Sequence, residues 1–429
     1  MVQLRTAISI GKAINKVMKE DCKVFPDEMV DLMDCANRFL AEDLIATENV
    51  PAFDRALYDG FAIRTEDTVN ATKTNPAVFD VVGAIGAGSI FKSTVNAFQA
   101  VRIMTGAEMP ASCNAVVMLE DVSEFIENGN SKIKVTQVVS SGERVFTKGS
   151  ELKQGACIAS KGTEITPGVI GLLATFGFHQ VKVKKKPIVG ILATGSELLE
   201  VHEPLVPGKI RNSNSYMLLS QVAQVGGEPI YLGKLEDDLE KSVRVIQDAL
   251  QRVDVLITTG GVSVGDYDYL PAIYERLGAN VLFNKVAMRP GSVTTVAKLD
   301  ERYLFGLSGN PSASFIGFEL FVRPLIRKML GNSSPHLLSA QAILSEDYPT
   351  PNNFTQLVRT KCELKNSQIV VAANGLNMSN AITSLAGADA ISILPPTKKG
   401  YRKGETVDIL LLSVHKGQQN SVFGGDDDV

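Results

Sequence analysis

The sequence predicts a multidomain α/β protein with a doubly wound α/β domain at its centre. The chain has 429 residues, and at roughly 100–200 residues per domain this length predicts two to four domains. Between residues 187 and 330, continuous apolar strands alternate with helices, which indicates a mainly parallel sheet covered on both faces. On either side of this region, short β-branched runs separated by turn residues indicate smaller β domains.

The first 45 residues are expected to form two helices. Residues 8–18 and 26–44 both place apolar side chains three and four positions apart, which is the helical period. Pro26 followed by acidic residues is typical of the first turn of a helix. The N-terminus is therefore predicted to be mainly helical.

A small, mostly β domain is predicted over residues 48–145, where short apolar runs alternate with glycines. Residues 168–178 again have the pattern of a helix, ending at Gly177. Helical character therefore lies on both sides of the β domain. We expect residues 1–47 and 146–184 to form one discontinuous α+β linker domain around it.

The central α/β domain is predicted over residues 185–331. Its strands are expected at 188–194, 228–235, 253–259, 281–288, 292–299 and 303–309, and its helices at 214–227, 238–252, 268–278 and 311–330. After Gly331 the helical pattern stops, and alternating runs predict an all-β C-terminal domain over 332–417. The tail, 418–429, is expected to be disordered.

Composition excludes several classes of protein. The net charge is −4 and the only dense basic run is Lys182–Lys186, so a nucleic-acid-binding protein is not expected. We see no signal peptide and no apolar stretch of about 20 residues, so no membrane association is expected. Five scattered cysteines without a CxxC pair are typical of reduced thiols, and we expect a cytoplasmic protein.

Three loops of the central domain combine glycines with hydroxyl side chains: residues 193–200, 258–268 and 306–312. Each follows a predicted strand, and ligands of open α/β sheets bind beyond the carboxyl ends of the strands. Neither GxxxxGK[ST] nor a GxGxxG after a strand is present, so these loops are neither a P-loop nor a dinucleotide fingerprint. Their exposed backbone N–H groups still suit an anion, to which Lys285 and Arg289 add positive charge.

The same loops also carry carboxylates, which repel phosphate. Phosphate can therefore bind there only if a cation lies between the two. Glu197, Asp266 and Asp268 are explained if they hold Mg²⁺, which takes oxygen ligands from carboxylates and from substrate phosphates. As an alternative, Asp266 and Asp237, which both precede predicted helices, act only as helix caps. A second polar cluster, residues 51–64, is either a functional loop or a connection between domains held by an Asp–Arg pair.

An ordered series of motifs resembles the molybdopterin molybdotransferase (MoeA) family, which includes the C-terminal domain of gephyrin. The motifs are PAFDRALYDGFA, RIMTGAEMP, VVMLED, KGSELKQG, ATGSEL, TTGGVSVGDYDY, KVAMRPG, GLSGNP and the closing segment NMSNAITSLAGADAISILP. Together they span nearly the whole chain. The resemblance implies an elongated homodimer in which the central domain binds molybdopterin.

The activity implied is insertion of molybdenum from molybdate into adenylylated molybdopterin, with Mg²⁺ and with release of AMP. The substrate is supplied in the family by a separate molybdopterin adenylyltransferase. Matching motif to motif gives the catalytic candidates Asp59, Glu151, Glu197, Asp237 and Asp268. Substrate-binding candidates, from the motifs and the loops, are Thr105, Thr194, Gly195, Gly260, Gly261, Ser263, Lys285, Arg289, Ser308 and Asn310.

The sequence departs from the family pattern at four places. Glu151 stands for the usual aspartate, Ser196 changes TGDEL to TGSEL, Ser292 replaces a second lysine, and GLPGNPVS reads GLSGNPSA. Two alternatives therefore stay open: a non-catalytic scaffold with the same fold, and a Mg²⁺-dependent phosphoanhydride hydrolase. The scattered cysteines leave no candidate for a covalent nucleophile in these loops.

Overall fold

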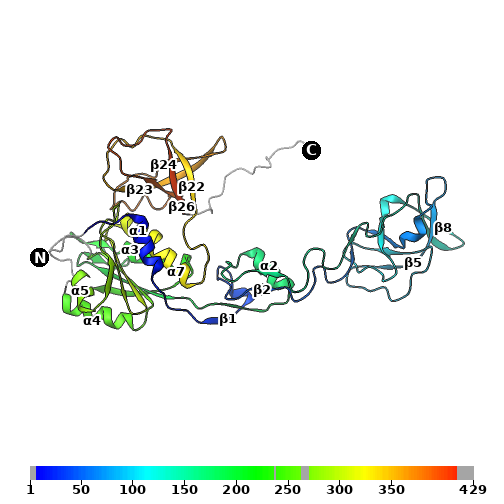
Figure 1. Cartoon of the computed structure of the whole chain (residues 1–429), viewed down its shortest axis with the longest axis horizontal. Coiled ribbons are helices and arrows are strands. Elements are labelled where there is room, and N and C mark those ends of the chain that lie inside the picture. The colour runs from blue at the N-terminus through cyan, green and yellow to red at the C-terminus, as the bar shows by residue number, and fades with distance from the viewer. Residues whose placement is uncertain (1–5, 236–237, 262–269, 413–429) are drawn as a thin grey trace. The chain divides into compact units, whose positions relative to one another are not determined.

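A computed structural model describes residues 6–235, 238–261 and 270–412. The chain divides into two compact units (Figure 1). The larger unit comprises Met1–Ala41, Gly162–Thr166 and Gln180–Val429, and the smaller unit comprises Glu42–Lys161 and Pro167–His179. Of the predicted features, the tail at 418–429 lies outside the described residues. The predicted domain boundaries stay predictions.

The core of the larger unit is a six-stranded sheet in the order β16-β13-β17-β21-β20-β18. Strands β16, β13, β17 and β21 pair in parallel, whereas β20 is antiparallel to both of its neighbours. The bounds are β13 Ile188–Thr194, β16 Glu228–Leu235, β17 Val255–Thr259, β18 Asn280–Phe283, β20 Thr295–Leu299 and β21 Arg302–Leu307. The predicted mainly parallel sheet is confirmed.

Helices cover both faces of this sheet, which explains why its strands are apolar without alternation. Ile191 and Ile257 pack with helices α3, α6 and α7 on one face, whereas Leu192 and Leu256 pack with α4 and α5 on the other. These side chains are at most 1% exposed, and burial of each stabilises the fold by roughly 1.5–3 kcal/mol. The helices are α3 Ser213–Gln224, α4 Leu239–Leu250, α5 Leu270–Arg276, α6 Pro311–Gly317 and α7 Arg323–Met329, with a π-helical turn, Phe318–Val322, between the last two.

The N-terminal prediction is half correct. Helix α1, Ile10–Lys19, forms as expected and begins at Ser9, whose hydroxyl accepts a hydrogen bond from the Lys12 N–H. The helix predicted over 26–44 is wrong: the chain there forms strand β1, Asp27–Asp31, and a short 3₁₀ turn, Leu32–Asp34. Strand β1 pairs antiparallel with β12, Gln180–Lys184, a partner that lies about 150 residues away in the sequence.

The C-terminal domain is an all-β sheet, as predicted. Strands pair in the order β23-β24-β22-β26-β25, and β25 also pairs with β23, so the sheet closes on itself. The short strand β19, Met288–Arg289, of the central domain extends it by pairing with β23. The bounds are β22 Ser339–Leu344, β23 Thr355–Lys365, β24 Gln368–Ala373, β25 Ala390–Leu394 and β26 Thr406–Leu411.

The smaller unit contains a further six-stranded sheet, in the order β7-β4-β6-β5-β9-β8. Its bounds are β4 Gly60–Ile63, β5 Ala77–Ile85, β6 Gln99–Ile103, β7 Ala115–Met118, β8 Val122–Glu127 and β9 Asn130–Val135. Two-stranded ladders join β2, Leu44–Ile45, to β11, Cys157–Ala159, and β3, Arg55–Ala56, to β10, Val145–Phe146. The predicted helix near 168–178 is present as α2, Pro167–Thr175.

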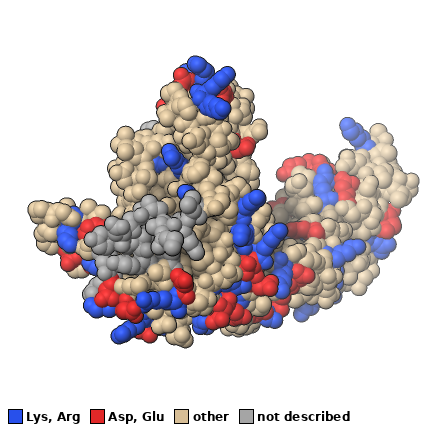
Figure 2. All heavy atoms as spheres, turned by 60° about the vertical axis from the view of Figure 1, so that its left-hand side comes forward, with Lys and Arg blue, Asp and Glu red and all other residues tan. Residues whose placement is uncertain are grey.

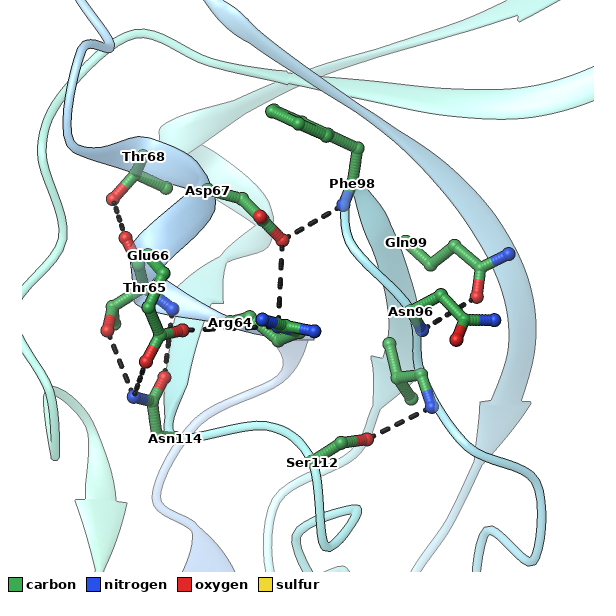
Figure 3. Close-up of polar contacts among 11 residues, drawn as sticks. Arg64, Thr65, Glu66, Asp67, Thr68, Asn96, Phe98, Gln99, Ser112 and Asn114 are labelled. Carbon is green, nitrogen blue, oxygen red and sulfur yellow. Dashed lines mark hydrogen bonds and ion pairs between the residues drawn. The ribbon is translucent and has the colours of Figure 1, made fainter.

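Polar contacts fix the segment that follows β4 (Figure 3). The Asp67 carboxylate accepts a hydrogen bond of 2.9 Å from the Phe98 N–H and lies 4.0 Å from the Arg64 guanidinium. The Asn114 side chain accepts from the Thr65 N–H and donates to the Thr65 hydroxyl. Strand β4 leads directly into this network, which therefore holds the carboxyl end of the strand in place. Through the strand, the network also fixes the position of the residues that precede β4.

Charged side chains of both signs are interspersed over the face shown in Figure 2. This distribution agrees with a small net charge of −4. Among the described residues, none of the helices is long and apolar enough to span a membrane.

Candidate functional site

The three glycine-containing loops lie together at the carboxyl edge of the central sheet. Strands β13, β17 and β21 are adjacent and parallel, and they end at Thr194, Thr259 and Leu307. The Thr194 hydroxyl donates to the Thr259 carbonyl over 3.1 Å, and the Gly260 N–H donates to the Leu307 carbonyl over 3.0 Å. The predicted convergence of these loops is therefore observed. Of their residues, 262–269 lie outside the described part of the chain.

The close approach of these loops depends on glycine. Gly260 has φ +92°, and a Cβ atom there would lie 2.6 Å from the Thr194 hydroxyl oxygen and 2.7 Å from its carbonyl oxygen. Gly309 approaches Gly260 so closely that its Cβ would lie 3.5 Å from the Gly260 Cα. Gly261, with φ +65°, also takes a left-handed conformation. Backbone groups, not side chains, therefore form much of this edge, as an anion-binding loop requires.

Asn214, in the first turn of α3, joins two of the loops and was not predicted. Its side-chain NH₂ donates to the Gly309 carbonyl over 2.8 Å and to the Thr259 hydroxyl over 3.0 Å. Because a carbonyl can only accept, this contact assigns the NH₂ group to that side. The amide oxygen is buried and has no hydrogen-bond partner among the described residues. An asparagine just inside a predicted helix resembles an ordinary N-terminal residue, so the sequence gives no signal for this contact.

Glu197 is the one predicted metal ligand within the described residues, since Asp266 and Asp268 lie outside them, as do Asp237 and Ser263. Its carboxylate folds over the backbone of Gly195, so that a Cβ at Gly195 would lie 2.4 Å from one carboxylate oxygen. Glu197 is exposed, and no described residue forms an ion pair or hydrogen bond with its side chain. A free carboxylate beside an anion-binding loop fits Mg²⁺, although no group of three or more possible metal ligands occurs within the described ranges.

A hollow of about 430 Å³, here called the oxyanion hollow, lies between the central sheet and the C-terminal domain. It contains the predicted residues Arg289, Ser308 and Asn310. The Ser308 hydroxyl accepts from the Asn310 N–H over 3.2 Å, and the Asn310 side chain donates to the Ser379 hydroxyl over 3.2 Å. Ser292, which stands where the family pattern has a second lysine, also lines this hollow. Lys285 does not, and its described contact is a backbone hydrogen bond to Ile8.

Arg359, in β23, supplies a buried positive charge at the same hollow and was also not predicted. Its side chain is 2% exposed and donates to the Asn377 side chain, the Ser384 hydroxyl and the carbonyls of Leu376 and Met378. None of these partners is a carboxylate. Burial accordingly lowers the pKa of Arg359. A buried cation with no carboxylate partner among the described residues, in the same hollow as the exposed Arg289 guanidinium, makes this hollow suitable for an oxyanion.

In the smaller unit, Asp59 and Thr105 form a direct pair. One carboxylate oxygen of Asp59 accepts from the Thr105 N–H and from its hydroxyl, both over 2.7 Å. These two hydrogen bonds, the backbone one first, lower the pKa of Asp59 below its ordinary value and stabilise the ionised carboxylate. Both residues are exposed, which leaves the other carboxylate oxygen accessible.

The motifs around this pair also lie side by side. The Asp54 carboxylate accepts from the Lys148 N–H over 2.6 Å, and the Glu151 N–H donates to the Val50 carbonyl over 3.0 Å. Arg55 stacks over Phe146, with 5.1 Å from its guanidinium to the ring centre, so the proposed Asp–Arg pair does not hold this loop. Glu151 is exposed, and no described contact joins its carboxylate to Asp59.

Comparisons with known proteins agree with this architecture. Residues 8–177 match the MoeA N-terminal region (domain I and II), residues 190–328 match a probable molybdopterin binding domain, and residues 341–412 match the MoeA C-terminal region (domain IV). The chain is 50% identical over 419 residues to the molybdopterin molybdenumtransferase of Bacillus subtilis, covering 98% of this chain and 97% of that protein. The chain belongs to the MoeA family.

Other MoeA relatives cover the chain to a similar extent. The molybdopterin molybdenumtransferase of Staphylococcus epidermidis is 44% identical over 422 residues, which cover 98% of this chain and 100% of that protein. The crystal structure of a molybdopterin biosynthesis moeA protein from Pyrococcus horikoshii is 32% identical, with a TM-score of 0.81 over 95% of this chain and 100% of that one. The MoeA architecture, with its central α/β domain and C-terminal β domain, is thereby confirmed.

Proposed function

We propose that this chain is a molybdenum insertase, a transferase that uses adenylylated molybdopterin and molybdate and releases AMP. The observation that carries this proposal is the buried Arg359 guanidinium, which meets Arg289 in a hollow lined by Ser308 and Asn310. Relatives at 44–50% identity over nearly their full length are molybdopterin molybdenumtransferases, which supports the same reaction.

In this proposal the oxyanion hollow binds molybdate. The two guanidinium groups offset the charge of the dianion, and the hydroxyls and amide of Ser308, Asn310 and Ser379 donate to its oxygens. Arg359 is held rigidly by its carbonyl and hydroxyl partners, so little ordering free energy is needed when the anion binds. Molybdate would thus be placed beside the glycine loops that bind molybdopterin.

The glycine loops would bind the phosphate groups of the adenylylated substrate through backbone N–H groups of Gly195, Gly260 and Gly261. Thr194 and Lys285 add a hydroxyl and a positive charge. Rate enhancement would come from placing the two anions against each other and from stabilising charge that develops as the phosphoanhydride is cleaved.

Glu197, with Asp266 and Asp268, would hold Mg²⁺ in this proposal. The ion, when bound, would neutralise the pyrophosphate and polarise the phosphorus that is attacked. Asp237 and Glu151 are proposed as further acids of the site. Asp59, whose pKa Thr105 lowers, would position a donor group of the substrate or a water molecule.

Three further features of the proposal follow from the resemblance. The protein would act as a homodimer, receive its substrate from a molybdopterin adenylyltransferase, and work in the cytoplasm. Light scattering should give a mass of twice the 46.1 kDa of one chain. A monomer at micromolar concentration would contradict this part of the proposal.

The reaction is tested by mixing purified protein with adenylylated molybdopterin, Mg²⁺ and molybdate, and measuring AMP and the molybdenum cofactor. We expect AMP release that depends on molybdate. Release at the same rate without molybdate would favour the phosphoanhydride hydrolase, and no release would favour the scaffold. Glu197→Ala should abolish turnover, whereas the exposed and distant Glu405→Ala, which removes the same charge, should not.

A further inference from the structure

The central sheet has a second hollow at the edge opposite the glycine loops. It is lined by Lys23, Phe25, Lys185, Lys186, Arg252 and Arg302, and is called here the basal hollow. Ile188, the first residue of β13, Asp254, which directly precedes β17, and Arg302, the first of β21, all contribute to it. It therefore lies at the amino ends of the same strands whose carboxyl ends carry the candidate site. Its volume is about 570 Å³.

One of its cations is neutralised within the fold. Lys23 forms a 2.8 Å ion pair with one carboxylate oxygen of Asp254, whose other oxygen accepts from the Ile188 N–H over 2.9 Å. Both oxygens of Asp254 are thus occupied. This pair connects two chain segments and leaves no charge for a ligand.

Four other cations of the basal hollow have no such partner. Within the described residues, the side chains of Lys185, Lys186, Arg252 and Arg302 form neither ion pairs nor hydrogen bonds. Two acids, Asp300 and Glu301, lie at the same hollow and are likewise unpaired, so unpaired cations exceed unpaired acids by two. Like charges gathered in a concave surface repel each other and raise the local concentration of anions.

Lys184, next to Lys185 in the sequence, shows that lysines in this part of the chain can form ion pairs. Lys184 forms a 2.6 Å ion pair with Asp27 and also donates to the Phe25 carbonyl. Lys298, on the same sheet, pairs with Glu20 at 3.2 Å. Within the basic run at 182–186, Lys184 is therefore neutralised, whereas Lys185 and Lys186 line the basal hollow.

We propose that the basal hollow binds a small anion that carries two or more phosphate groups. A volume of about 570 Å³ is within the range of roughly 300–1,000 Å³ typical of small-molecule sites, and a single tetrahedral anion would fill little of it. Two guanidinium groups offer paired donors that match phosphate oxygens, and two lysines add point charges. The site is separate from the proposed insertase reaction and does not depend on it.

A ligand in the basal hollow would contact the two chain segments that join the β1–β12 ladder to α1 and to β13. Lys23 lies between α1 and β1, and Lys185 and Lys186 lie between β12 and β13. Arg252 lies in the loop before β17, and Arg302 is the first residue of β21. A bound polyphosphate therefore fixes both connections against the base of the sheet, and amide exchange over residues 20–26 and 185–188 should slow when it binds.

The test is isothermal titration of the full chain with inorganic pyrophosphate, without Mg²⁺ and in an Arg289→Ala and Lys285→Ala background that weakens anion binding in the oxyanion hollow and at the glycine loops. Lys185→Ala combined with Lys186→Ala should lower the affinity at least ~10-fold. The matched control is Lys398→Ala combined with Lys399→Ala, an exposed adjacent pair that removes the same charge, and it should leave the affinity within about twofold.

Arg302→Gln provides a second, independent variant and should weaken pyrophosphate as well. Absence of pyrophosphate binding, or equal weakening by the basal and control pairs, would overturn the proposal. Binding of citrate as tight as that of pyrophosphate would overturn the assignment to phosphate groups. Molybdate-dependent AMP release should be unchanged in the Lys185→Ala and Lys186→Ala variants, so failure here and failure of the insertase proposal are distinguishable.

Discussion

Thr105 is the main cause of the lowered pKa of Asp59, because it donates to the carboxylate from both its N–H and its hydroxyl. Thr105→Val removes the hydroxyl and keeps the N–H. We therefore expect the lowered pKa of Asp59 to rise part of the way towards its ordinary value. A carboxyl with a lowered pKa keeps its ionised interactions above that pKa and loses them as the pH falls through it.

NMR titration of the Asp59 carboxyl carbon measures this shift directly. Thr105→Ser, which retains a hydroxyl, is the control and should leave the pKa where it is. An unchanged pKa in Thr105→Val would show that the hydroxyl does not contribute. Asp59→Ala should also abolish AMP release if Asp59 acts in the proposed reaction.

Arg359 holds the structure around it and, in the proposed function, also contributes to binding molybdate. Arg359→Lys keeps the charge and loses the planar set of donors that holds Leu376, Asn377 and Met378. We expect the free energy of unfolding to fall by about 2–4 kcal/mol and molybdate affinity to fall at least ~10-fold. Urea denaturation and molybdate titration measure the two effects.

Arg289→Lys separates the effect of a guanidinium group on molybdate affinity from its effect on stability. Arg289 is exposed, and its described side-chain contact is its stacking over Phe354 at 5.9 Å, so stability should change little while molybdate affinity falls. Normal molybdate affinity in a folded Arg359→Lys variant would contradict the role of Arg359 in the oxyanion hollow.

At the scale of single residues, those in recognisable motifs are identified from the sequence. Residues whose side chains contact other elements of the fold are missed. Arg289, Ser308 and Asn310 stand in recognisable loops, and the structure brings them into one hollow. Arg359 and Asn214 lie within a strand and a helix, where a polar residue looks ordinary. Only the tertiary fold shows that the first is buried and that the second joins two loops.

Gly260 directly follows the end of β17, in the glycine loop 258–268, and its conformation is a property of that loop. Gly260→Ala would place a Cβ 2.6 Å from the Thr194 hydroxyl oxygen, at a φ of +92°. We expect the unfolding free energy to fall by about 3 kcal/mol or more, because strain and a clash with backbone add together. AMP release should fall with it.

Gly278→Ala is the matched control for this loop. Gly278 also has a positive φ, +68°, but no atom lies within 4 Å of the Cβ position. This substitution should cost only roughly 1–2 kcal/mol, the cost of a left-handed conformation, and should leave activity intact. Equal effects of the two substitutions on AMP release would show that the close approach to Thr194 is not required.

The elements that the sequence predicted best are those with local signals. Helix α1 has a capping serine and a regular apolar stripe, and the strands of the central sheet are apolar throughout because both faces are covered. The segment 26–44 has a similar stripe but forms β1, because pairing with Gln180–Lys184 outweighs its helical period. A partner so distant in sequence leaves no local pattern.

At the scale of the whole molecule, the two units have separate apolar cores. Phe79, fully buried in the smaller unit, and Phe305, fully buried in the central sheet, do not share a cluster. We expect calorimetry to show two unfolding transitions. Phe79→Ala should lower only one of them, and Phe305→Ala only the other, each by about 3–5 kcal/mol of unfolding free energy. A single transition that shifts equally in both variants would show one cooperative unit.

Helix α1 imposes an order on biosynthesis. Its buried face, Ala13 and Val17, packs in the same core as Phe321 and Leu325, and Lys328 donates to the Met18 carbonyl at the end of the helix. Helix α1 thus waits during synthesis for a partner 310 residues later in the chain. At roughly 5–20 residues per second this takes about 15–60 s, during which its apolar stripe is open to chaperones and the smaller unit can fold. Helix α1 is therefore translated long before it can reach its native contacts.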